Sequence, residues 1–222
     1  MGRFRTQTFS FARHPRSSTN LDGCLTPNAP LLLWTLLLVP ISYHVAMRIG
    51  LISDTHIPTA AKELWPQIFE AFHGVDLIMH AGDLMVPEVI DWLEEVAPVM
   101  AVWGNGDFRG WQRTVPPDDP RLSEAKVLPV GNLRIGLVHD LQLPEHPPLR
   151  TLEGQMHYYF RRPVDVIVRG STHAAEISEL KGVLIVNPGS PTFPNHQSTR
   201  LGTIGFLDIE EGQVTPSILQ LE

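Results

Sequence analysis

Residues 47–56 read MRIGLISDTH, in which a short apolar run leads directly into an aspartate and a histidine two positions apart. The apolar run at 47–53 is typical of a buried strand that ends in a polar loop. The alternation continues with an apolar helical face over 64–72, a strand over 76–80, an amphipathic helix over 86–96 and a strand over 98–103. This is the βαβ pattern, which predicts a parallel sheet covered by helices on one face.

The second half of the chain is rich in predicted strands. A hairpin is predicted from 126–130 and 133–139 around Gly131-Asn132, and one helical stretch covers 149–161. Five further runs, separated by turn residues, are expected to pair mostly antiparallel: 165–169, 175–180, 183–187, 202–209 and 214–221. No clear boundary interrupts this order, so the sequence predicts one mixed α/β domain over 47–222.

Residues 1–46 differ in kind from the rest of the chain. They carry four arginines against one aspartate, whereas the whole chain has a formal net charge of −7. The apolar run at 29–41 contains two prolines and is shorter than the roughly 20 residues that span a bilayer. An export signal requires a basic region directly before its apolar stretch, and this run has none. We expect 1–46 to be an extension, either disordered or translated ahead of a true start at Met47, with export by an N-terminal signal as the alternative.

The composition excludes several classes of protein. Of the 222 residues, 43% are hydrophobic and 18% are charged, which excludes a disordered chain, a coiled coil and a collagen-like repeat. The single cysteine, Cys24, excludes a disulfide framework and a cysteine-rich zinc module. The negative net charge argues against a protein that coats nucleic acid. We expect a cytoplasmic protein without a membrane span, and the oligomeric state is not predicted.

Metal-ligand side chains stand at the ends of five predicted strands. Ligands collect at the carboxyl ends of strands in α/β sheets. Imidazole and carboxylate together bind divalent cations, including the pairs of cations that catalyse phosphoryl transfer. Taken one at a time, each residue has a structural explanation as a helix cap, a turn or a buried histidine. All five strand ends together favour a ligand site. The residues are Asp54 and His56, then Asp83, then Asn105 and Asp107, then His139, and then His173.

A known family carries these residues in the same order. The series Asp54-x-His56, Gly82-Asp83, Gly104-Asn105-x-Asp107, His139 and Gly170-x-x-His173 resembles the calcineurin-like metallophosphoesterases. The loop Asn187-Pro188-Gly189-Ser190 is similar to one in the small, single-domain YfcE-type phosphodiesterase branch. The resemblance covers 47–222 and implies an α/β fold, a four-layer αββα sandwich of two mixed β-sheets. It implies a metal-dependent phosphodiesterase or phosphatase, in which a metal-bound hydroxide attacks a small phosphoester at a dinuclear site.

The resemblance also implies a role for each site residue. It gives metal-binding and catalytic roles to six residues: Asp54, His56 and His173 on the first metal, Asp83 bridging both metals, and Asn105 and His139 on the second metal. Two divalent ions per chain are expected, with manganese preferred and iron, nickel, zinc or magnesium as alternatives. Asp107 is expected to orient its neighbours. Arg109 is expected to meet the substrate phosphate, with a solvated loop charge as the alternative.

Three positions depart from the family pattern. Ser171 stands where the family has a histidine on the second metal, so we expect a weaker second site that depends on added metal. Gly106 stands where larger relatives have a histidine that protonates the leaving group, which favours esters with good leaving groups. Asp140 replaces a common glycine. Its carboxylate would assist the second metal or repel the substrate phosphate, and both interpretations stay open.

The sequence has two alternative interpretations, neither of which is a phosphoesterase. The first is a protein-binding scaffold of the same fold, like the retromer subunit. A scaffold does not need all six ligand residues, and the missing histidine at Ser171 is the kind of change with which an enzyme would begin to become a scaffold. The retained ligands favour the enzyme, and metal content would discriminate the two. A dinucleotide site is disfavoured, because Gly104-x-Gly106 lacks the third glycine and the helix of that fingerprint.

Overall fold

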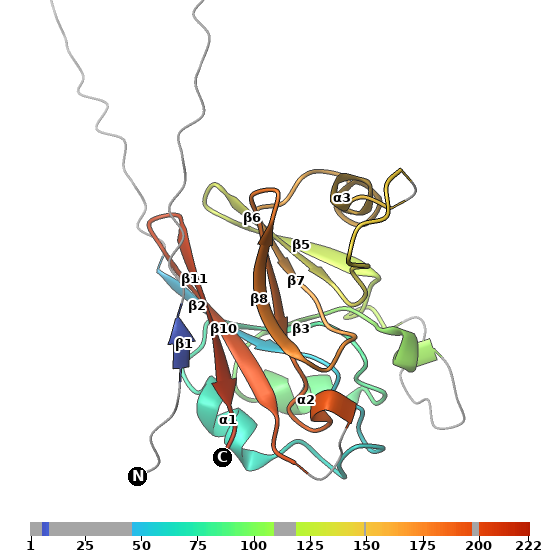
Figure 1. The fold of residues 1–222 in the computed structure, drawn as a ribbon. Coiled ribbons are helices and arrows are strands. Elements are labelled where there is room, and N and C mark those ends of the chain that lie inside the picture. The colour runs from blue at the N-terminus through green and yellow to red at the C-terminus, as the bar shows by residue number, and fades with distance from the viewer. Residues whose placement is uncertain (1–5, 9–45, 109–118, 149, 197–199) are drawn as a thin grey trace, which may run out of the picture.

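The computed structural model describes residues 6–8, 46–108, 119–148, 150–196 and 200–222, and two β-sheets face each other in it (Figure 1). The first sheet has the strand order β1 (Thr6–Thr8), β11 (Gln213–Gln220), β10 (Thr203–Glu210), β2 (Met47–Ile52), β3 (Leu77–His80) and β4 (Val99–Ala101). The second sheet has the order β5 (Ala125–Val130), β6 (Leu133–Val138), β7 (Val166–Val168), β9 (Val183–Pro188) and β8 (Ala175–Leu180).

Three apolar layers separate the two sheets and the helices. Ile49 and Leu51 of β2 pack between the sheets against residues of β6 and β7. Helices α1 (Pro66–Phe72) and α2 (Glu88–Glu94) cover the outer face of the first sheet. Helix α3 (Leu152–Phe160) covers the outer face of the second. This arrangement confirms the predicted four-layer αββα sandwich of two mixed sheets.

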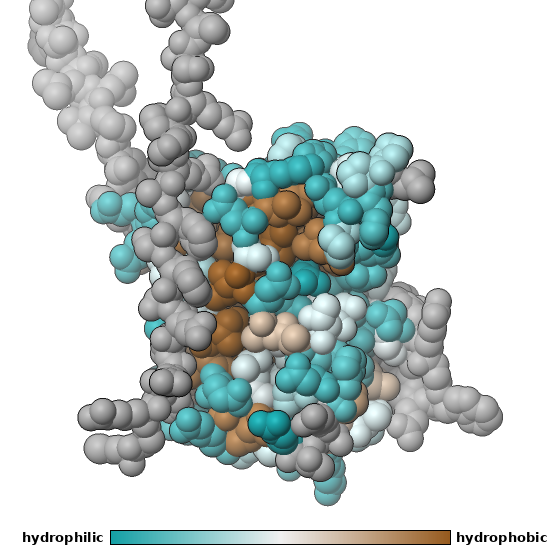
Figure 2. All heavy atoms as spheres, viewed as in Figure 1, coloured by the Kyte–Doolittle hydropathy of each residue, from teal (hydrophilic) through white to brown (hydrophobic). Residues whose placement is uncertain are grey.

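Apolar side chains also close the open side of the sandwich. Figure 2 shows them gathered on one face of the molecule, between polar side chains above and below. Ile177 of β8 and Val214 and Ile218 of β11 are partly buried against the core between the sheets. In the described part of the chain, no helix covers this edge of the sandwich (Figure 1).

The predicted βαβ units are confirmed, and their helices are shorter than the apolar pattern indicates. Strands β2, β3 and β4 pair in parallel. Helix α1 begins at Pro66 rather than at Leu64, which agrees with the preference of proline for the first turn of a helix. Gly50 makes room for α1, because a Cβ at this position would lie 2.7 Å from a ring carbon of Phe72.

The pairing in the second half is more mixed than predicted. The hairpin of β5 and β6 around Gly131-Asn132 is confirmed, and β8–β9 and β10–β11 are antiparallel. However, β6–β7 and β7–β9 are parallel, because α3 and β8 provide the crossovers that parallel neighbours require. The carboxyl ends of β2, β3 and β4 in one sheet and of β6 and β7 in the other therefore carry the loops that hold the candidate residues.

The prediction for residues 1–46 lies almost entirely outside the described residues. Within that segment, Thr6–Thr8 form β1 and pair antiparallel with β11. None of the helices in the described part of the chain has the length and apolar character needed to cross a membrane.

Candidate metal centre

Five of the six predicted ligands converge in two overlapping groups. Their candidate ligand atoms all lie within 4.8 Å of one another inside each group, and Asp54 belongs to both. His56 Nε2 lies 3.3 Å from His173 Nε2, and His173 Nε2 lies 3.5 Å from Asp54 Oδ1. The first group is Asp54, His56 and His173, and the second is Asp54, Asp83 and His139.

Asp83 lies between the histidines of the two groups. Its Oδ2 atom is 3.4 Å from His56 Nε2 and 3.6 Å from His139 Nε2. Its Oδ1 atom accepts a hydrogen bond of 2.6 Å from the backbone N–H of Gly106. The carboxylate is therefore held on one side by a loop of the neighbouring strand and faces ligand nitrogens on the other.

The imidazole rings are oriented so that their Nε2 atoms face the centre. His139 Nδ1 donates to the carbonyl oxygen of Ala81 at 2.7 Å, and His173 Nδ1 donates to that of Phe193 at 3.0 Å. A histidine that donates one ring nitrogen to a carbonyl keeps a lone pair on the other, which is the usual state of a metal ligand. His139 Nε2 is buried and, among the residues that the structure describes, has no hydrogen-bond partner. A divalent cation bound by these groups would satisfy that nitrogen, so the residues present fit the expected metal.

Burial shifts the protonation of the candidate ligands. Asp54 is fully buried, and burial raises the pKa of its carboxyl to about 7 although the backbone N–H of Ser171 donates to it. Burial lowers the pKa of His56 to about 4 and also lowers the pKa of His173. The two histidines are therefore neutral near pH 7, the form in which imidazole binds a cation.

Several of these residues have a backbone conformation that L-residues rarely adopt. Asp54, His56, Asp83 and His173 all have φ between 47° and 58°, and Ser171 has φ of 75°. Each left-handed residue other than glycine costs roughly 1 kcal/mol or more, and such residues cluster at functional sites. The loops are thus held by their surroundings in a geometry that brings the ligand atoms together.

Asp107 contacts backbone rather than ligand side chains. It accepts hydrogen bonds from the backbone N–H groups of Asp83, Gly104 and Met85, at 3.0, 2.8 and 2.7 Å. These bonds tie the loop after β3 to the loop after β4. The orienting role given to Asp107 stays a prediction, for which these contacts supply a physical means.

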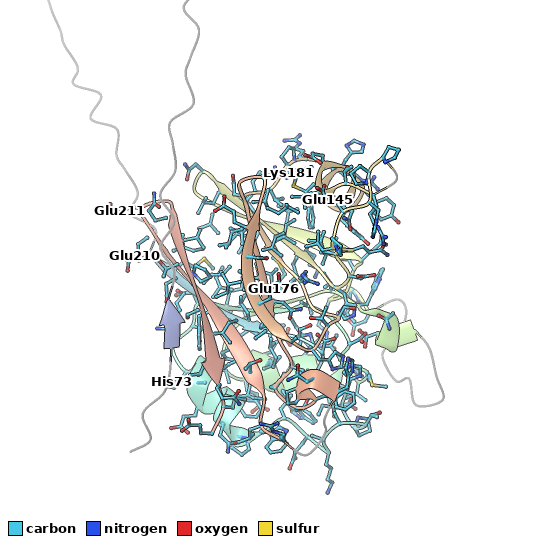
Figure 3. All side chains as sticks on the ribbon, in the orientation of Figure 1. His73, Glu145, Glu176, Lys181, Glu210 and Glu211 are labelled. Atoms are coloured by element: carbon cyan, nitrogen blue, oxygen red, sulfur yellow. The ribbon has the colours of Figure 1, made fainter. Side chains whose placement is uncertain are left out.

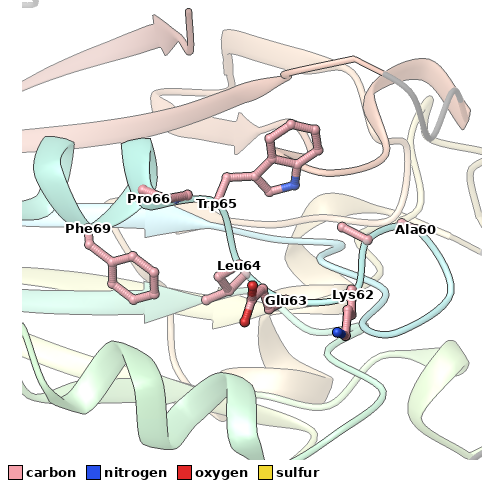
Figure 4. A pocket seen from close by; sticks show the side chains of 8 residues that line it. Ala60, Lys62, Glu63, Leu64, Trp65, Pro66 and Phe69 are labelled. Atoms are coloured by element: carbon pink, nitrogen blue, oxygen red, sulfur yellow. The ribbon is translucent and has the colours of Figure 1, made fainter.

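Asn105 lies beside His139 of the second group. Asn105 is exposed at the start of the 3-10 helix η1 (Asn105–Phe108), and it shares the lining of a cavity of about 200 Å³ with His139. Arg109, predicted to meet the substrate phosphate, lies outside the described residues. A larger cavity of about 680 Å³ beside α1, lined by residues such as Trp65 and Phe69, contains none of the predicted ligands (Figure 4).

The three departures from the family pattern all lie at the site. Ser171 contributes its backbone N–H to Asp54. At Gly106, an added Cβ would lie 2.8 Å from the Asp83 carboxyl carbon, so this position excludes a larger residue in the present loop conformation. Asp140 is exposed and accepts a 3.4 Å hydrogen bond from the side chain of Gln142.

The loop after β9 anchors the first ligand loop, a role that the sequence analysis did not assign. Ser190 Oγ donates to the carbonyl oxygen of Asp54 at 2.7 Å, and Thr192 Oγ1 donates to that of Thr55 at 2.6 Å. Asn187 donates from Nδ2 to the carbonyl oxygen of Gly170 at 3.0 Å. The sequence signal for this anchor is the Asn187–Ser190 motif.

His196 was also missed, because no motif or predicted strand end marks it. It ends the short 3-10 helix η2 (Pro194–His196), and its ring centroid lies 4.1 Å from that of His173. Phe193 packs edge-on against both histidine rings, at 5.2 Å from His173 and 5.7 Å from His196. These two side chains form a wall beside the first ligand group.

His80 links the two ligand loops from behind. It ends the strand predicted over 76–80, and it is fully buried at the end of β3. Burial lowers the pKa of its ring to about 3, so the ring is neutral. Its Nδ1 atom accepts from the backbone N–H of Gly82 at 3.1 Å, and its Nε2 atom therefore donates to Thr55 Oγ1 at 3.2 Å. One ring thus joins the residue between Asp54 and His56 to the residue before Asp83.

Replacing His80 by leucine should weaken divalent-metal binding by about 10- to 100-fold, because both loops lose a shared partner of the kind that orients metal ligands. His80→Gln keeps one acceptor and one donor and should recover most of the affinity. Calorimetric titration of Mn²⁺ measures both, with Ile78→Ala as a control that weakens the same strand. Equal metal affinity in the leucine and glutamine variants would contradict the positioning role.

The chain is similar to known proteins in sequence and in fold. A family model described as the calcineurin-like phosphoesterase superfamily domain matches residues 47–212. A protein of Methanothermobacter thermautotrophicus named probable metallophosphoesterase is 40% identical over 149 residues, which are 67% of this chain and 79% of that protein. A Methanocaldococcus jannaschii protein named phosphodiesterase is 26% identical over 182 residues, 78% of this chain and all of that protein. The crystal structure of wild-type Vps29 complexed with Zn²⁺ from Entamoeba histolytica is similar in fold, with a TM-score of 0.55, 26% identity, and coverage of 78% of this chain and 92% of that one.

Proposed function

Because the chain belongs to the calcineurin-like phosphoesterase superfamily, we propose that it is a metal-dependent phosphoesterase acting on a small phosphodiester or phosphomonoester. The observation that carries the proposal is the pair of ligand groups that share Asp54. They include His139, whose buried Nε2 has no hydrogen-bond partner in the described part of the chain. The name phosphodiesterase of one relative supports the diester as the first substrate class to test. On the sequence grounds given above, we place the reaction in the cytoplasm.

The proposal divides the ligands between two cations. Asp54, His56 and His173 would hold the first, and Asn105 with His139 would hold the second, while the position of Asp83 between His56 and His139 suits a shared ligand. Divalent cations, when bound, supply Lewis acidity that stabilises negative charge on a phosphoryl group and lower the pKa of water. Manganese is our proposed metal, and the zinc complex of the Vps29 structure supports zinc as the alternative.

The protein groups around the ligands have their own part in this function. Asp107 and His80 fix the loops that present the ligands, so the site is oriented before substrate arrives. Gly106 brings no side chain to protonate a leaving group, and its backbone N–H is bonded to Asp83. The proposed substrate is therefore an ester whose alcohol leaves without strong acid assistance, such as an aryl ester.

We propose that the second cation binds more weakly than the first. Ser171 stands where the family has an imidazole, and its backbone N–H is directed to Asp54. The second group then has one imidazole, His139, where the first has two. The first ion should survive dialysis, and the second should need added metal.

The second candidate is a protein-binding scaffold of the same fold. The structural similarity to Vps29 supports it, since that protein is named for vacuolar protein sorting. The oriented imidazoles favour the enzyme, and so does the buried His139 Nε2, which lacks a hydrogen-bond partner among the described residues, because a scaffold has no need of either feature.

The test uses the full chain, freed of metal and then titrated with Mn²⁺. We expect hydrolysis of bis(p-nitrophenyl) phosphate or p-nitrophenyl phosphate that rises with added Mn²⁺ beyond the first equivalent and is lost in chelator. The released p-nitrophenolate is measured by its absorbance, and bound metal by elemental analysis. Absence of turnover with Mn²⁺, Zn²⁺ and Mg²⁺ would contradict the enzyme, and less than one tightly bound ion per chain would favour the scaffold.

A further inference from the structure

A small cavity adjoins the proposed second metal position. It has a volume of about 200 Å³ and lies between the loop after β4, the loop after β6 and helix α3. His139 and Asn105 line one end of it, and Trp103, Glu124, Asp140 and Tyr159 line the rest. Sites for whole small ligands are larger, at roughly 300–1,000 Å³. The volume therefore suits one substituent of a substrate whose phosphate is held by the metal ligands.

Two carboxylates give this cavity a negative charge that the metal groups do not use. Glu124 and Asp140 are both exposed, and neither belongs to the two groups of candidate metal ligands. Glu124 accepts a 3.3 Å hydrogen bond from the Tyr158 hydroxyl, and Asp140 accepts one from Gln142. Among the residues that the structure describes, no lysine, arginine or histidine forms an ion pair with either carboxylate. The cavity thus lacks a counter-ion from the described part of the chain.

The charges and the aromatic walls act at the same place. Glu124, Asp140 and Tyr159 line the same cavity. Burial raises the pKa of the Tyr159 hydroxyl, and the negative charges of Asp140 and Glu124 raise it further. Trp103 lines the cavity with Tyr159 and has an indole ring, which is the best partner for a cation over an aromatic face. Aromatic rings together with carboxylates are the surroundings that alkylammonium groups prefer. A second phosphate or a carboxylate would be repelled here.

We propose that this cavity, defined by Trp103, Glu124, Asp140 and Tyr159, binds an ammonium group on the alcohol of the substrate. The substrate class is then a phosphoester of an amino alcohol, in which the phosphate meets the metal ligands and the cationic group enters the cavity. The inference rests on the proposed function, because it assumes that the phosphate binds at His139 and its neighbours. It also gives Asp140 a role in selecting the substrate, which distinguishes it from a metal ligand.

The test is equilibrium binding, so it does not depend on turnover. The full chain loaded with Mn²⁺ is titrated calorimetrically with phosphocholine and with 3,3-dimethylbutyl phosphate, in which a neutral carbon replaces the quaternary nitrogen. We expect phosphocholine to bind about tenfold more tightly than the neutral ligand. This ratio corresponds to the binding free energy expected from one cation–π contact together with two exposed charge contacts. Added salt should reduce the difference, because these charges are exposed.

Variants assign the preference to the cavity. The double variant Glu124→Gln/Asp140→Asn keeps the side-chain shapes and should bind the two ligands with equal affinity, and Asp140→Lys should favour the neutral one. The matched control, Glu210→Gln/Glu211→Gln, removes the same charge from the turn between β10 and β11, which lies away from α3 (Figure 3), and should keep the preference. Equal affinities in the unmodified protein, no binding of either ligand, or a preference that survives the double variant would each overturn the inference.

Two further measurements separate this inference from the proposed function. A protein that hydrolyses bis(p-nitrophenyl) phosphate but binds both ligands equally would contradict the ammonium site alone. A protein that prefers phosphocholine but hydrolyses no phosphoester would contradict the enzyme alone. Co-sedimentation of the protein with phosphatidylcholine vesicles would show that the ammonium group belongs to a lipid headgroup. Selective binding of phosphocholine without co-sedimentation would show that it belongs to a soluble ester. Both outcomes support the ammonium site.

Discussion

Replacing Asp83 by alanine should reduce metal-dependent phosphoester hydrolysis by about a thousandfold. The loss of a residue that only hydrogen-bonds to a metal ligand already lowers metal affinity or activity by about 10- to 100-fold, and Asp83 is itself a proposed ligand. The reason lies in its position. Asp83 Oδ2 is 3.4 Å from His56 Nε2 and 3.6 Å from His139 Nε2, so its removal affects both ligand groups. Elemental analysis of the purified variant should show a loss of bound metal alongside the loss of turnover.

Two further variants separate chemistry from folding. Asp83→Asn keeps the volume of the side chain and an oxygen that can accept from the Gly106 N–H, but it removes the negative charge. It should fold normally and remain close to the alanine variant in activity. Asp208→Ala removes an exposed carboxylate that pairs with Arg48 at 3.5 Å, and it should be fully active. Turnover in Asp83→Ala above about a tenth of the unmodified value would contradict the bridging position.

Adding a single methyl group at Gly104 should have the second largest effect. A Cβ there would lie 2.1 Å from Asp83 Oδ1 and 2.7 Å from the Asp83 backbone nitrogen, so either the carboxylate or the loop must move. Such overpacking costs typically about 1–3 kcal/mol of the free energy of unfolding. Displacement of a metal ligand should lower turnover by about 100-fold as well. Denaturant unfolding and the p-nitrophenyl assay measure the two effects separately.

The control for this variant is Gly154→Ala in α3. An added Cβ at that position would lie 3.2 Å from Thr151 Oγ1, and alanine is the better helix former. The control should keep its activity and change the free energy of unfolding by no more than about 1 kcal/mol. If Gly104→Ala binds metal and turns over substrate as well as Gly154→Ala does, a side chain at Gly104 does not displace Asp83 and the prediction is wrong.

The local periodicity of the chain predicts most of the fold. The βαβ units follow from apolar runs that alternate with helical spacing, and the β5–β6 hairpin follows from Gly131-Asn132 between two such runs. The parallel pairing of β7 with β6 and β9 does not follow in this way. A short apolar run such as Val166–Val168 carries no information on its partners, which are decided by the crossovers around it.

The candidate site is also predicted from the sequence only in part. Strand-end acids and histidines are visible in the sequence because each ends an apolar run, and five of the six predicted ligands meet in the structure. His80 belongs to such a run itself, so its bonds to Thr55 and Gly82 depend on a neighbouring loop that the sequence does not place. His196 depends on the course of the loop after β9 in the same way.

The anchoring of the Asp54 loop by Ser190 and Thr192 has a consequence for the order of events during protein synthesis. These bonds join residues that are 136 and 137 positions apart in the chain. Contacts of such separation form only after the intervening chain has closed into a loop. A nascent chain with β2 and β3 already emerged from the ribosome therefore has the ligands of the first loops, but it lacks the anchoring bonds from Ser190 and Thr192. Metal loading should be a late event, which follows the emergence of the loop after β9.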